Sequence, residues 1–469
     1  MKYTKIIASI SDIRCEVDFI RSLYDEGMNV ARMNTAHITE ESALNLLNNI
    51  RAVSEEIAVL IDTKGPEVRT VSEDTLELKI GDRVTIINDN EAVSAKDNII
   101  STNYSGFVKD VPAGSSILID DGETELLVVD KKDDKLVCDV KNIGTIKNKK
   151  SINVPKCHFD LPALTEKDIK YIRFAARNKI DFIAHSFVRS KADVDAVQKI
   201  LNEEGSDAKI IAKIENEQGV KNIDEILDSA YGIMVARGDL GIEVPAEKLP
   251  VYQVELVRKC VERSKIVIIA TQMLHTMIEN PRPTRAEVSD IATAIFSRTD
   301  AIMLSGETAY GKYPVEAVRL MSKIAKEVEK SKDKRNDIIP NTDSDDVAAH
   351  LAEFAVKSSE SLDAKAIVTN TLSGKTARYI SAFRGVKPVY AMCYNESVMR
   401  KLTISYGVFP FTESPKKNKE KTVKAALDRL VDDKVLDKKD RVVYAGGSFG
   451  VGGGTTFVEI SDVDSLTKK

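Results

Sequence analysis

Eight short runs of β-branched residues recur along this chain of 469 residues, and each is followed by a segment with the apolar spacing of a helix. The repeated order of strand and helix is typical of parallel βα units, and eight such units predict a closed (β/α)₈ TIM barrel. The predicted strands are residues 4–10, 28–33, 57–61, 181–184, 209–214, 231–236, 265–270 and 300–304. In such barrels the chemistry lies on the loops that follow the carboxyl ends of the strands.

The alternation of strands and helices is interrupted between residues 67 and 155. Short alternating runs at 76–80, 83–87, 116–119 and 126–129 follow one another there without long helices, and turn signals separate them. We therefore expect residues 68–155 to form an inserted all-β domain, a small β-barrel, after the third barrel strand. In that position it would act as a lid over the barrel mouth.

A third domain is expected beyond the eighth strand. An amphipathic helix at 313–330 and a charged linker at 331–346 precede β runs at 366–369, 389–392 and 441–445, which alternate with helical patterns. This order predicts a small α/β domain. The expected division is residues 1–67 and 156–332 for the barrel, 68–155 for the lid and 333–469 for the C-terminal domain.

Composition excludes several classes of protein. With 68 Lys and Arg against 73 Asp and Glu, the net charge is −5, which lacks the positive field that holds a nucleic-acid backbone. No run approaches the roughly 18 uninterrupted apolar residues of a membrane helix. The five cysteines are scattered without a CxxC motif, which indicates reduced thiols. We expect a cytoplasmic protein that binds neither nucleic acid nor membrane.

Polar residues follow the predicted strands at positions that should meet at one barrel mouth. Glu215 and Asp239, on adjacent strands, suit Mg²⁺, which keeps waters and prefers substrate phosphate to a full protein cage. Arg32, Lys213 and Arg237 could offset the charge of a phosphorylated acid, and phosphoryl transfer needs little beyond positioning, metal and cations. Taken singly, Glu215 would serve equally well in a structural salt bridge with Lys213 or Arg237.

Six separated motifs, in order, resemble the pyruvate kinase family. They are DTKGPEVR at 62–69, KIEN at 213–216, VARGDLG at 235–241, ATQML at 270–274, PTRAEVSD at 283–290 and SGET at 305–308. The resemblance implies a barrel with the active site, a lid after its third strand and a C-terminal regulatory domain. It also implies that phosphoenolpyruvate and ADP are converted to pyruvate and ATP in the last step of glycolysis, by a homotetramer.

The resemblance assigns roles to the residues at the mouth. Glu215 and Asp239 would ligate the Mg²⁺ or Mn²⁺ that also binds phosphoenolpyruvate, with the backbone near Gly238 beside the substrate carboxylate. Lys213 would stabilise the phosphoryl group as it passes to the nucleotide. Thr271 matches the residue beside the enolate and would take part in protonation through water, since a hydroxyl is too weak an acid to act alone.

Further positions are implied for phosphate and nucleotide. Arg32 and Arg69 match phosphate-contacting positions, Arg32 as part of the catalytic set and Arg69 towards the nucleotide. Asn34 and His37 lie where the family meets the nucleotide. Glu307 matches a residue that supports the site from behind, although a capped helix start explains it as well.

A K⁺ site is the point at which the chain departs from the family. Asn34, Asp62 and Thr63 would supply oxygens, but Ala36 stands where the family usually has a serine whose hydroxyl helps to hold K⁺. Glu67 matches the residue type of K⁺-dependent members. We therefore predict stimulation by K⁺.

A second candidate site lies in the C-terminal domain, where a loop between a β run and a helix could cradle a phosphate. Its residues are Thr371, Ser373, Gly374, Lys375 and Thr376. The alternative is an ordinary capped turn. The family places its effector loop here, which implies a phosphorylated sugar or AMP, and the glycine-rich residues 446–454 would face it.

Two other functions remain open from the residues alone. A Mg²⁺-dependent lyase or aldolase that acts on an α-keto acid through an enolate would also use Glu215, Asp239 and Arg32. A catalytically silent sensor could bind phosphorylated metabolites through the loop at Thr371. Dependence on ADP separates the phosphotransferase from the lyase, and an intact Lys213 disfavours the sensor.

Overall fold

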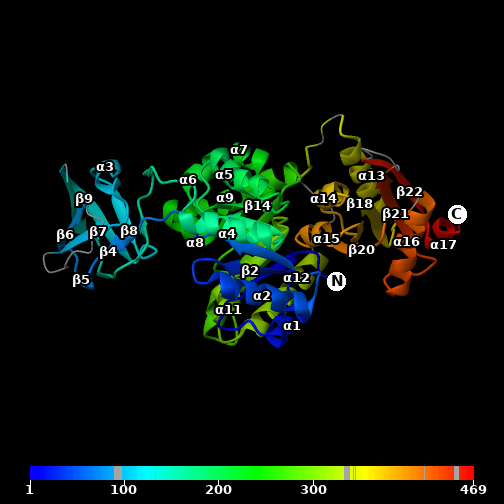
Figure 1. The fold of residues 1–469 in the computed structure, drawn as a ribbon, viewed down its shortest axis with the longest axis horizontal. Coiled ribbons are helices and arrows are strands. Elements are labelled where there is room, and N and C mark those ends of the chain that lie inside the picture. Colours follow the sequence, from blue (N-terminus) through cyan, green and yellow to red (C-terminus); the bar gives the residue numbers. More distant parts are fainter. Residues whose placement is uncertain are drawn as a thin grey trace.

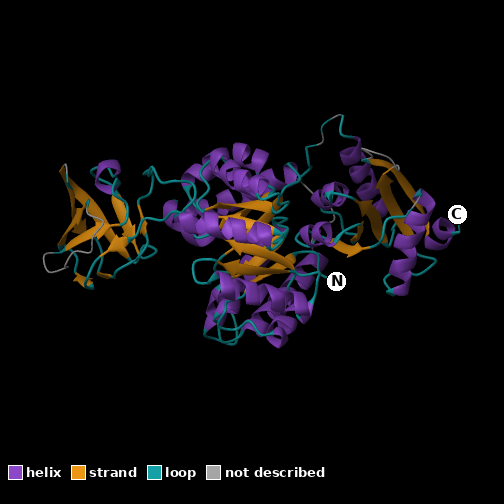
Figure 2. Cartoon of the chain, viewed as in Figure 1, coloured by secondary structure: helices purple, strands orange, loops and turns teal. Residues whose placement is uncertain are grey.

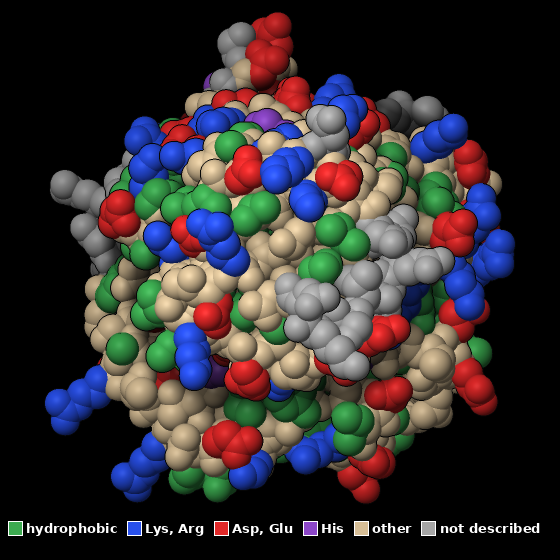
Figure 3. All heavy atoms as spheres, turned by 90° about the vertical axis from the view of Figure 1, so that its left-hand side faces the viewer, with side chains coloured by type: hydrophobic (Ala, Val, Ile, Leu, Met, Phe, Trp, Pro, Cys, Tyr) green, Lys and Arg blue, Asp and Glu red, His purple; other side chains and the backbone are tan. Residues whose placement is uncertain are grey.

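The computed structural model describes residues 1–88, 98–132, 134–331, 338–341, 343, 345–416, 418–447 and 454–468. Figure 1 shows three bodies in a row, with the barrel in the middle, the β-rich lid at one end and the C-terminal domain at the other. Among the described residues, no helix has both the length and the apolar character needed to span a bilayer. Seen from the lid end, cationic and anionic side chains are interspersed over the surface (Figure 3).

The eight predicted parallel strands are confirmed, and they close into a barrel in the order β1-β17-β16-β15-β14-β13-β3-β2. Their bounds are β1 (Lys5–Ser9), β2 (Val30–Asn34), β3 (Ala58–Asp62), β13 (Phe182–His185), β14 (Lys209–Ile214), β15 (Gly232–Ala236), β16 (Ile266–Ala270) and β17 (Ala301–Leu304). Large apolar side chains such as Ile7, Phe182 and Ile211 fill the interior, because inward positions alternate with outward ones along each strand. The barrel is therefore a packed core with a mouth, not a pore.

Helices surround the barrel and cover its outer apolar face (Figure 2). They are α1 (Val17–Asp25), α2 (Glu40–Val53), α4 (Glu166–Arg177), α5 (Lys191–Glu203), α6 (Glu217–Lys221), α7 (Ile223–Ser229), α8 (Arg237–Glu243), α9 (Leu249–Glu262), α10 (Arg285–Phe296), α11 (Gly306–Ala309) and α12 (Pro314–Ser331). Several begin with capping boxes, at Thr39, Thr165 and Thr284, which satisfy free amides of the first turn. These caps fix where each helix starts after its loop.

The lid forms after β3, as predicted, and its described elements are strands with the one exception of the short helix α3. Its elements are β4 (Thr70–Val71), β5 (Leu76–Leu78), β6 (Arg83–Ile87), β7 (Ile99–Thr102), α3 (Phe107–Asp110), β8 (Ser116–Ile119), β9 (Thr124–Lys132), β10 (Lys135–Val140), β11 (Gly144–Ile146) and β12 (Ile152–Asn153). The described strands pair as a seven-stranded sheet and a separate two-stranded sheet, and α3 adds one helical turn. Val84, Phe107 and Ile117 belong to the lid's own buried core.

The C-terminal domain has a five-stranded sheet in the order β20-β19-β18-β21-β22, in which only β22 is antiparallel. The strands are β18 (Ala366–Thr371), β19 (Val389–Cys393), β20 (Val408–Thr412), β21 (Arg441–Gly447) and β22 (Thr455–Asp462). The helices are α13 (Val347–Ser361), α14 (Lys375–Ala382), α15 (Glu396–Leu402), α16 (Lys419–Asp432) and α17 (Val463–Thr467). The predicted strands β18, β19 and β21 are confirmed, whereas β20 and β22 were not predicted.

Candidate active site

A cleft of about 730 Å³ separates the barrel mouth from the lid. Nine of the predicted residues line it: Arg32, Asn34, His37, Asp62, Thr63, Arg69, Lys213, Glu215 and Asp239. They come from the ends of β2, β3 and β14, from the start of α8 and from the first residues of the lid. The structure therefore brings together residues that the sequence spreads over two hundred positions.

Lys213, at the end of β14, lies at the centre of a buried polar cluster. Its ammonium is 2.9 Å from Glu215 Oε1 and 3.1 Å from Asp62 Oδ1, and it donates a hydrogen bond to Ser186 Oγ at 2.7 Å. Burial lowers the pKa of Lys213, but the two carboxylates outweigh this effect and raise it above its ordinary value. Lys213 is therefore a permanent cation on the floor of the cleft.

Asp62, the last residue of β3, orients the second cation of the floor. Its Oδ2 accepts a hydrogen bond from Arg32 Nε at 2.7 Å, and Arg32 also donates to Ser9 Oγ at 2.8 Å. Burial raises the pKa of Asp62, but Lys213 and Arg32 lower it below its usual value. The ionised Asp62 thus holds both cations in place at the mouth.

Glu215 and Asp239 form a pair of buried carboxylates whose charge the protein compensates only in part. Burial raises the pKa of Glu215 to about 7, and the neighbouring Asp239 contributes, although Lys213 and the amide of Phe187 oppose the shift. Burial also raises the pKa of Asp239, as does Asp121 of the lid. Two such carboxylates are stabilised in their ionised form by a divalent cation.

These donors fit Mg²⁺ or Mn²⁺ in kind. Among the described residues, no three His, Cys, Asp or Glu side chains converge closely enough to hold a metal ion. Two carboxylates fit an ion of the Mg²⁺ class, which takes its remaining ligands from water and substrate phosphate. Glu215 also makes the salt bridge with Lys213 that the sequence left open.

Thr271 lies next to the start of α8 and has a rare backbone conformation. Its φ is +67°, which is unusual for a β-branched residue, and Gln272 follows with φ +55°. Thr271 Oγ1 accepts a hydrogen bond from the amide of Gly238 at 2.8 Å and donates to the carbonyl of Ala270 at 2.6 Å. The strained turn after β16 and the start of α8 are thereby joined.

The expectation that Arg237 offers a free cation at the mouth is wrong. Its guanidinium is 8% exposed, pairs with Asp290 at 2.7 Å and donates to the carbonyl of Thr271 at 2.7 Å. The prediction placed the backbone of Arg237 after β15 but did not give the direction of its side chain. The side chain turns towards α10, where it meets Asp290. Arg237 therefore supports the turn at Thr271, and the PTRAEVSD motif supplies its partner.

The residues expected to hold K⁺ and the nucleotide line the same cleft. Asn34 Oδ1 accepts a hydrogen bond from the amide of Ala36 at 3.0 Å, and the carbonyl of Ala36 accepts one from Lys167 Nζ at 3.1 Å. Arg69 pairs with Glu67 at 2.6 Å where the chain passes into the lid. Asn34, Asp62 and Thr63 present oxygens of the kind that K⁺ takes.

The sequence reasoning missed the residues that the lid contributes. Asp120, Asp121, Lys149 and Lys150 line the cleft from its lid side, and Lys150 pairs with Asp120 at 2.6 Å. Asp121 lies in one of the turns between the predicted β runs, and Lys149 lies in the segment that returns to the barrel. The sequence shows the acidic pair at 120–121 and the lysines at 149–150, but only the fold shows that both lie at the mouth.

Glu307 joins two loops behind the mouth. Its carboxylate accepts hydrogen bonds from the amide of Leu274 at 3.1 Å, after β16, and from the amide of Ser305 at 2.7 Å, after β17. Glu307 thus both caps the start of α11 and holds the loop that follows Thr271. The supporting role and the capping role, which the sequence left as alternatives, occur together.

The loop predicted to hold an effector is a tight turn before α14. Thr371 Oγ1 accepts a hydrogen bond from the amide of Gly374 at 2.9 Å, and Gly374 has φ +82°. Lys375 pairs with Asp346 at 3.0 Å, and Thr376 Oγ1 lies 2.5 Å from Thr455 Oγ1. Ser373 is part of the same turn. Of the glycine-rich residues expected to face it, 448–453 lie outside the described residues.

The fold and the mouth define a TIM-barrel enzyme in which paired carboxylates and fixed cations face a lid. Family models described as "Pyruvate kinase, barrel domain" and "Pyruvate kinase, alpha/beta domain" match residues 1–318 and 349–461. The chain belongs to the pyruvate kinase family, the kinases of glycolysis.

Individual relatives match along the whole chain. The pyruvate kinase of Borreliella burgdorferi is 47% identical over 475 residues, which cover 100% of this chain and 98% of the relative. That of Bacillus licheniformis is 42% identical over 100% of this chain and 82% of the relative. That of Geobacillus stearothermophilus is 42% identical over 99% of this chain and 81% of the relative.

Proposed function

We propose that this protein transfers the phosphoryl group of phosphoenolpyruvate to ADP, giving pyruvate and ATP. The observation that carries the proposal is the position of Lys213, a buried cation held by Asp62 and Glu215 at the floor of the cleft. A fixed cation at that point stabilises the equatorial oxygens of a phosphoryl group in transit. Arg32, held by the same Asp62, adds a second cation for the phosphate.

The chemistry has two steps. An oxygen of the ADP β-phosphate attacks phosphorus, the bond between phosphorus and the enol oxygen breaks, and its electron pair stays on that oxygen as an enolate. The enolate carbon then takes a proton from water held beside Thr271, which gives pyruvate. Gly238 and Thr271 are joined by a hydrogen bond, and the substrate carboxylate is expected beside them, next to Asp239.

Glu215 and Asp239 are the residues that would hold Mg²⁺ or Mn²⁺. When bound, the ion neutralises negative charge on phosphate and carboxylate. Asn34, Asp62 and Thr63 would hold K⁺, and Asn34, His37 and Arg69 would contact the nucleotide. The divalent site rests on the raised pKa values of two buried carboxylates, and the K⁺ site on the oxygens at the ends of β2 and β3.

Each of the three domains would have a separate function. The barrel, residues 1–67 and 156–332, would carry the chemistry, and the lid, residues 68–155, would exclude water from the transfer. Residues 333–469 would respond to a phosphorylated sugar or AMP at the Thr371 loop. Assembly as a homotetramer and a cytoplasmic location are expected from the glycolytic family.

The test is steady-state formation of pyruvate from phosphoenolpyruvate and ADP with Mg²⁺. We expect Lys213→Met to lower kcat by about a thousandfold, the upper end of what one transition-state donor contributes. The matched control is Lys170→Met, which removes an exposed lysine of α4 and should stay within about twofold of wild type. Pyruvate formation that does not require ADP would indicate hydrolysis of phosphoenolpyruvate instead of transfer, and no ADP-dependent turnover by the wild type would overturn the proposal.

A further inference from the structure

The lid is attached to the barrel through a short neck in which the outgoing and returning segments are paired. The amide of Ile152 donates to the carbonyl of Val68 at 2.9 Å, the amide of Thr70 donates to the carbonyl of Lys150 at 2.9 Å, and Arg69 and Ser151 form a β-bridge between them. Because the two segments are hydrogen-bonded to each other, they move together. Residues 68–71 and 149–153 form this neck, and we expect them to move as one unit with the lid.

Beyond the neck, the returning chain is fixed to the barrel by Arg189. The Arg189 guanidinium donates to the carbonyl of Leu161 at 3.0 Å and to that of Phe159 at 3.4 Å. Asp193 of α5 holds Arg189 through contacts of 3.1 and 3.3 Å. Phe159 also stacks on Phe107 of the lid core, with 5.6 Å between ring centroids, so this segment contacts both the lid and the barrel.

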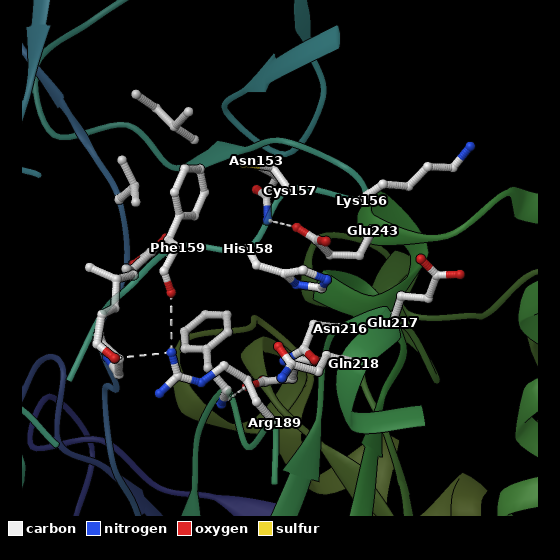
Figure 4. A pocket seen from close by; sticks show the side chains of 17 residues that line it. Asn153, Lys156, Cys157, His158, Phe159, Arg189, Asn216, Glu217, Gln218 and Glu243 are labelled. Carbon is white, nitrogen blue, oxygen red and sulfur yellow. Dashed lines mark hydrogen bonds between the residues drawn. The ribbon is translucent and has the colours of Figure 1, made fainter. Parts of the chain in front are cut away.

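Residues 154–158 connect the neck to the anchor, and they border a pocket of about 110 Å³ (Figure 4). The pocket lies between the neck, this connection and the loops after β13 and β14, and Cys157 and His158 line it. Val154 of this connection belongs to the lid's buried core and Cys157 packs against it, so the connection follows the lid where it passes the pocket.

One side-chain pair that lines the pocket joins the neck to the barrel. Asn153 Nδ2, at the end of β12, donates a hydrogen bond of 3.0 Å to Glu243 Oε1 (Figure 4). Glu243 is the last residue of α8, and the first turn of that helix holds Gly238 and Asp239. At 1.5 Å per residue, about 6 Å of helix separate Glu243 from Asp239. The bond thus joins the lid to the helix that carries a proposed metal ligand.

We propose that Asn153 and Glu243 are positioning residues that set the angle of the lid on the barrel by tying the neck to α8. The inference rests on the proposed function, and it deepens it by naming the contact that keeps the lid's acidic turn over the mouth. Asp121 of that turn and Asp239 of α8 line the same cleft, so the lid angle sets the separation between the lid and the proposed metal-binding carboxylates. Neither residue is expected to touch the reacting atoms.

The first variant is Asn153→Ala, which breaks the bond without adding charge. We expect the KM for ADP to rise about tenfold while kcat stays within about threefold, because the lid closes less often over a chemically intact floor. The matched control is Asn202→Ala on the exposed face of α5, which should leave both constants within about twofold. An unchanged KM for ADP in Asn153→Ala would overturn the inference.

A polarity swap separates positioning from general damage. Asn153→Asp places a second carboxylate against Glu243 and should impair the KM for ADP at least as much as Asn153→Ala. Adding Glu243→Gln restores a donor and an acceptor with reversed polarity at unchanged net charge. The double variant should therefore return to within about twofold of wild type, and a double variant as impaired as Asn153→Asp would contradict the inference.

Binding of Mn²⁺ to the substrate-free protein, followed by electron paramagnetic resonance, gives a readout that does not depend on turnover. Asn153→Asp should weaken Mn²⁺ binding about threefold, although added negative charge alone would strengthen it, and the double variant should restore it. If the wild type makes no pyruvate with ADP, the proposed function fails while this titration still tests the tie. If the wild type is active and Mn²⁺ binding is the same in all variants, the inference fails alone.

Discussion

The two ends of the barrel use the same kinds of charged residue in opposite ways. At the end away from the lid, Arg384 pairs with Asp300 at 2.7 Å, both side chains are at most 2% exposed, and Arg400 pairs with Asp181 at 2.8 Å. These pairs join the C-terminal domain to the barrel. At the mouth, the ion pairs of Lys213 face an open cleft instead.

The difference lies in how fully each carboxylate is satisfied. Asp300 also accepts hydrogen bonds from the amides of Tyr406 and Val267, each at 3.0 Å, so its lone pairs are used within the protein. Glu215 and Asp239 instead have raised pKa values, the mark of buried charge that is compensated only in part. Saturated pairs hold domains together, whereas partly compensated ones are available for ligands and chemistry.

The largest effect on stability is expected at the end of the barrel away from the lid, here called the saturated end because its carboxylates are fully hydrogen-bonded. Asp300→Ala removes one partner of a buried pair and leaves Arg384 and two amides unsatisfied, which should lower the free energy of unfolding by about 3–5 kcal/mol. Urea denaturation checks this value, with Asp228→Ala at an exposed pair as the control. Activity per folded molecule should remain within about twofold, and a large loss of kcat at full stability would contradict the division between the two ends.

The reverse pattern is expected at the mouth. Asp62→Asn keeps the shape but removes the charge that orients Arg32 and Lys213, so kcat/KM should fall by about a hundredfold to a thousandfold. The melting temperature should change by only a few degrees, because the freed cations face the cleft. Asp139→Asn, on an exposed pair in the lid, is the control. Strong destabilisation with intact turnover would show that Asp62 belongs with the structural pairs.

The sequence predicted the parts of this comparison that depend on local pattern. The barrel strands are buried β-branched runs, and strand ends are where barrel chemistry lies, so Lys213, Glu215 and Asp239 were found. Two-residue strands such as β4 and β12 carry no periodicity, and β20 contains Pro410, which disfavours a strand prediction.

What the sequence did not predict depends on tertiary direction. Arg237 follows a strand like the other mouth residues, yet its side chain turns to Asp290, and no local pattern encodes that turn. Asp121 and Lys150 reach the mouth because the lid folds over it, so their role requires the angle of the lid. Residues on strand ends are predictable, and residues delivered by a neighbouring domain are not.

A third prediction uses pH at the saturated end. Lys5 of β1 is 2% exposed, lies 4.4 Å from the ring centroid of Phe409, and burial lowers its pKa to about 7. The unfolded chain keeps this proton up to about pH 10.5, so between these values the unfolded state binds more protons and stability should rise with pH.

The measurement is the difference in stability between wild type and Lys5→Met from pH 7 to pH 9. The wild type should gain about 2 kcal/mol relative to the variant over this window, since a full proton difference contributes about 1.4 kcal/mol per pH unit. Below pH 7 the two curves should run parallel. A wild-type curve parallel to that of the variant across the whole window would show that Lys5 titrates normally.

The smallest effect is expected at the proposed K⁺ position, where the resemblance to the family implies a serine in place of Ala36. Oxygens are available there from Asn34, Asp62 and Thr63, but the side chain of Ala36 has none. The Ala36→Ser substitution would add a hydroxyl. One added ligand oxygen is of the order of 1 kcal/mol, so half-maximal activation should need about fivefold less K⁺. The measurement is activity against K⁺ concentration, with tetramethylammonium holding the ionic strength constant. Equal wild-type activity in both salts would remove K⁺ from the site, and the positive charge at the mouth would then come from cationic side chains such as Arg32 and Lys213.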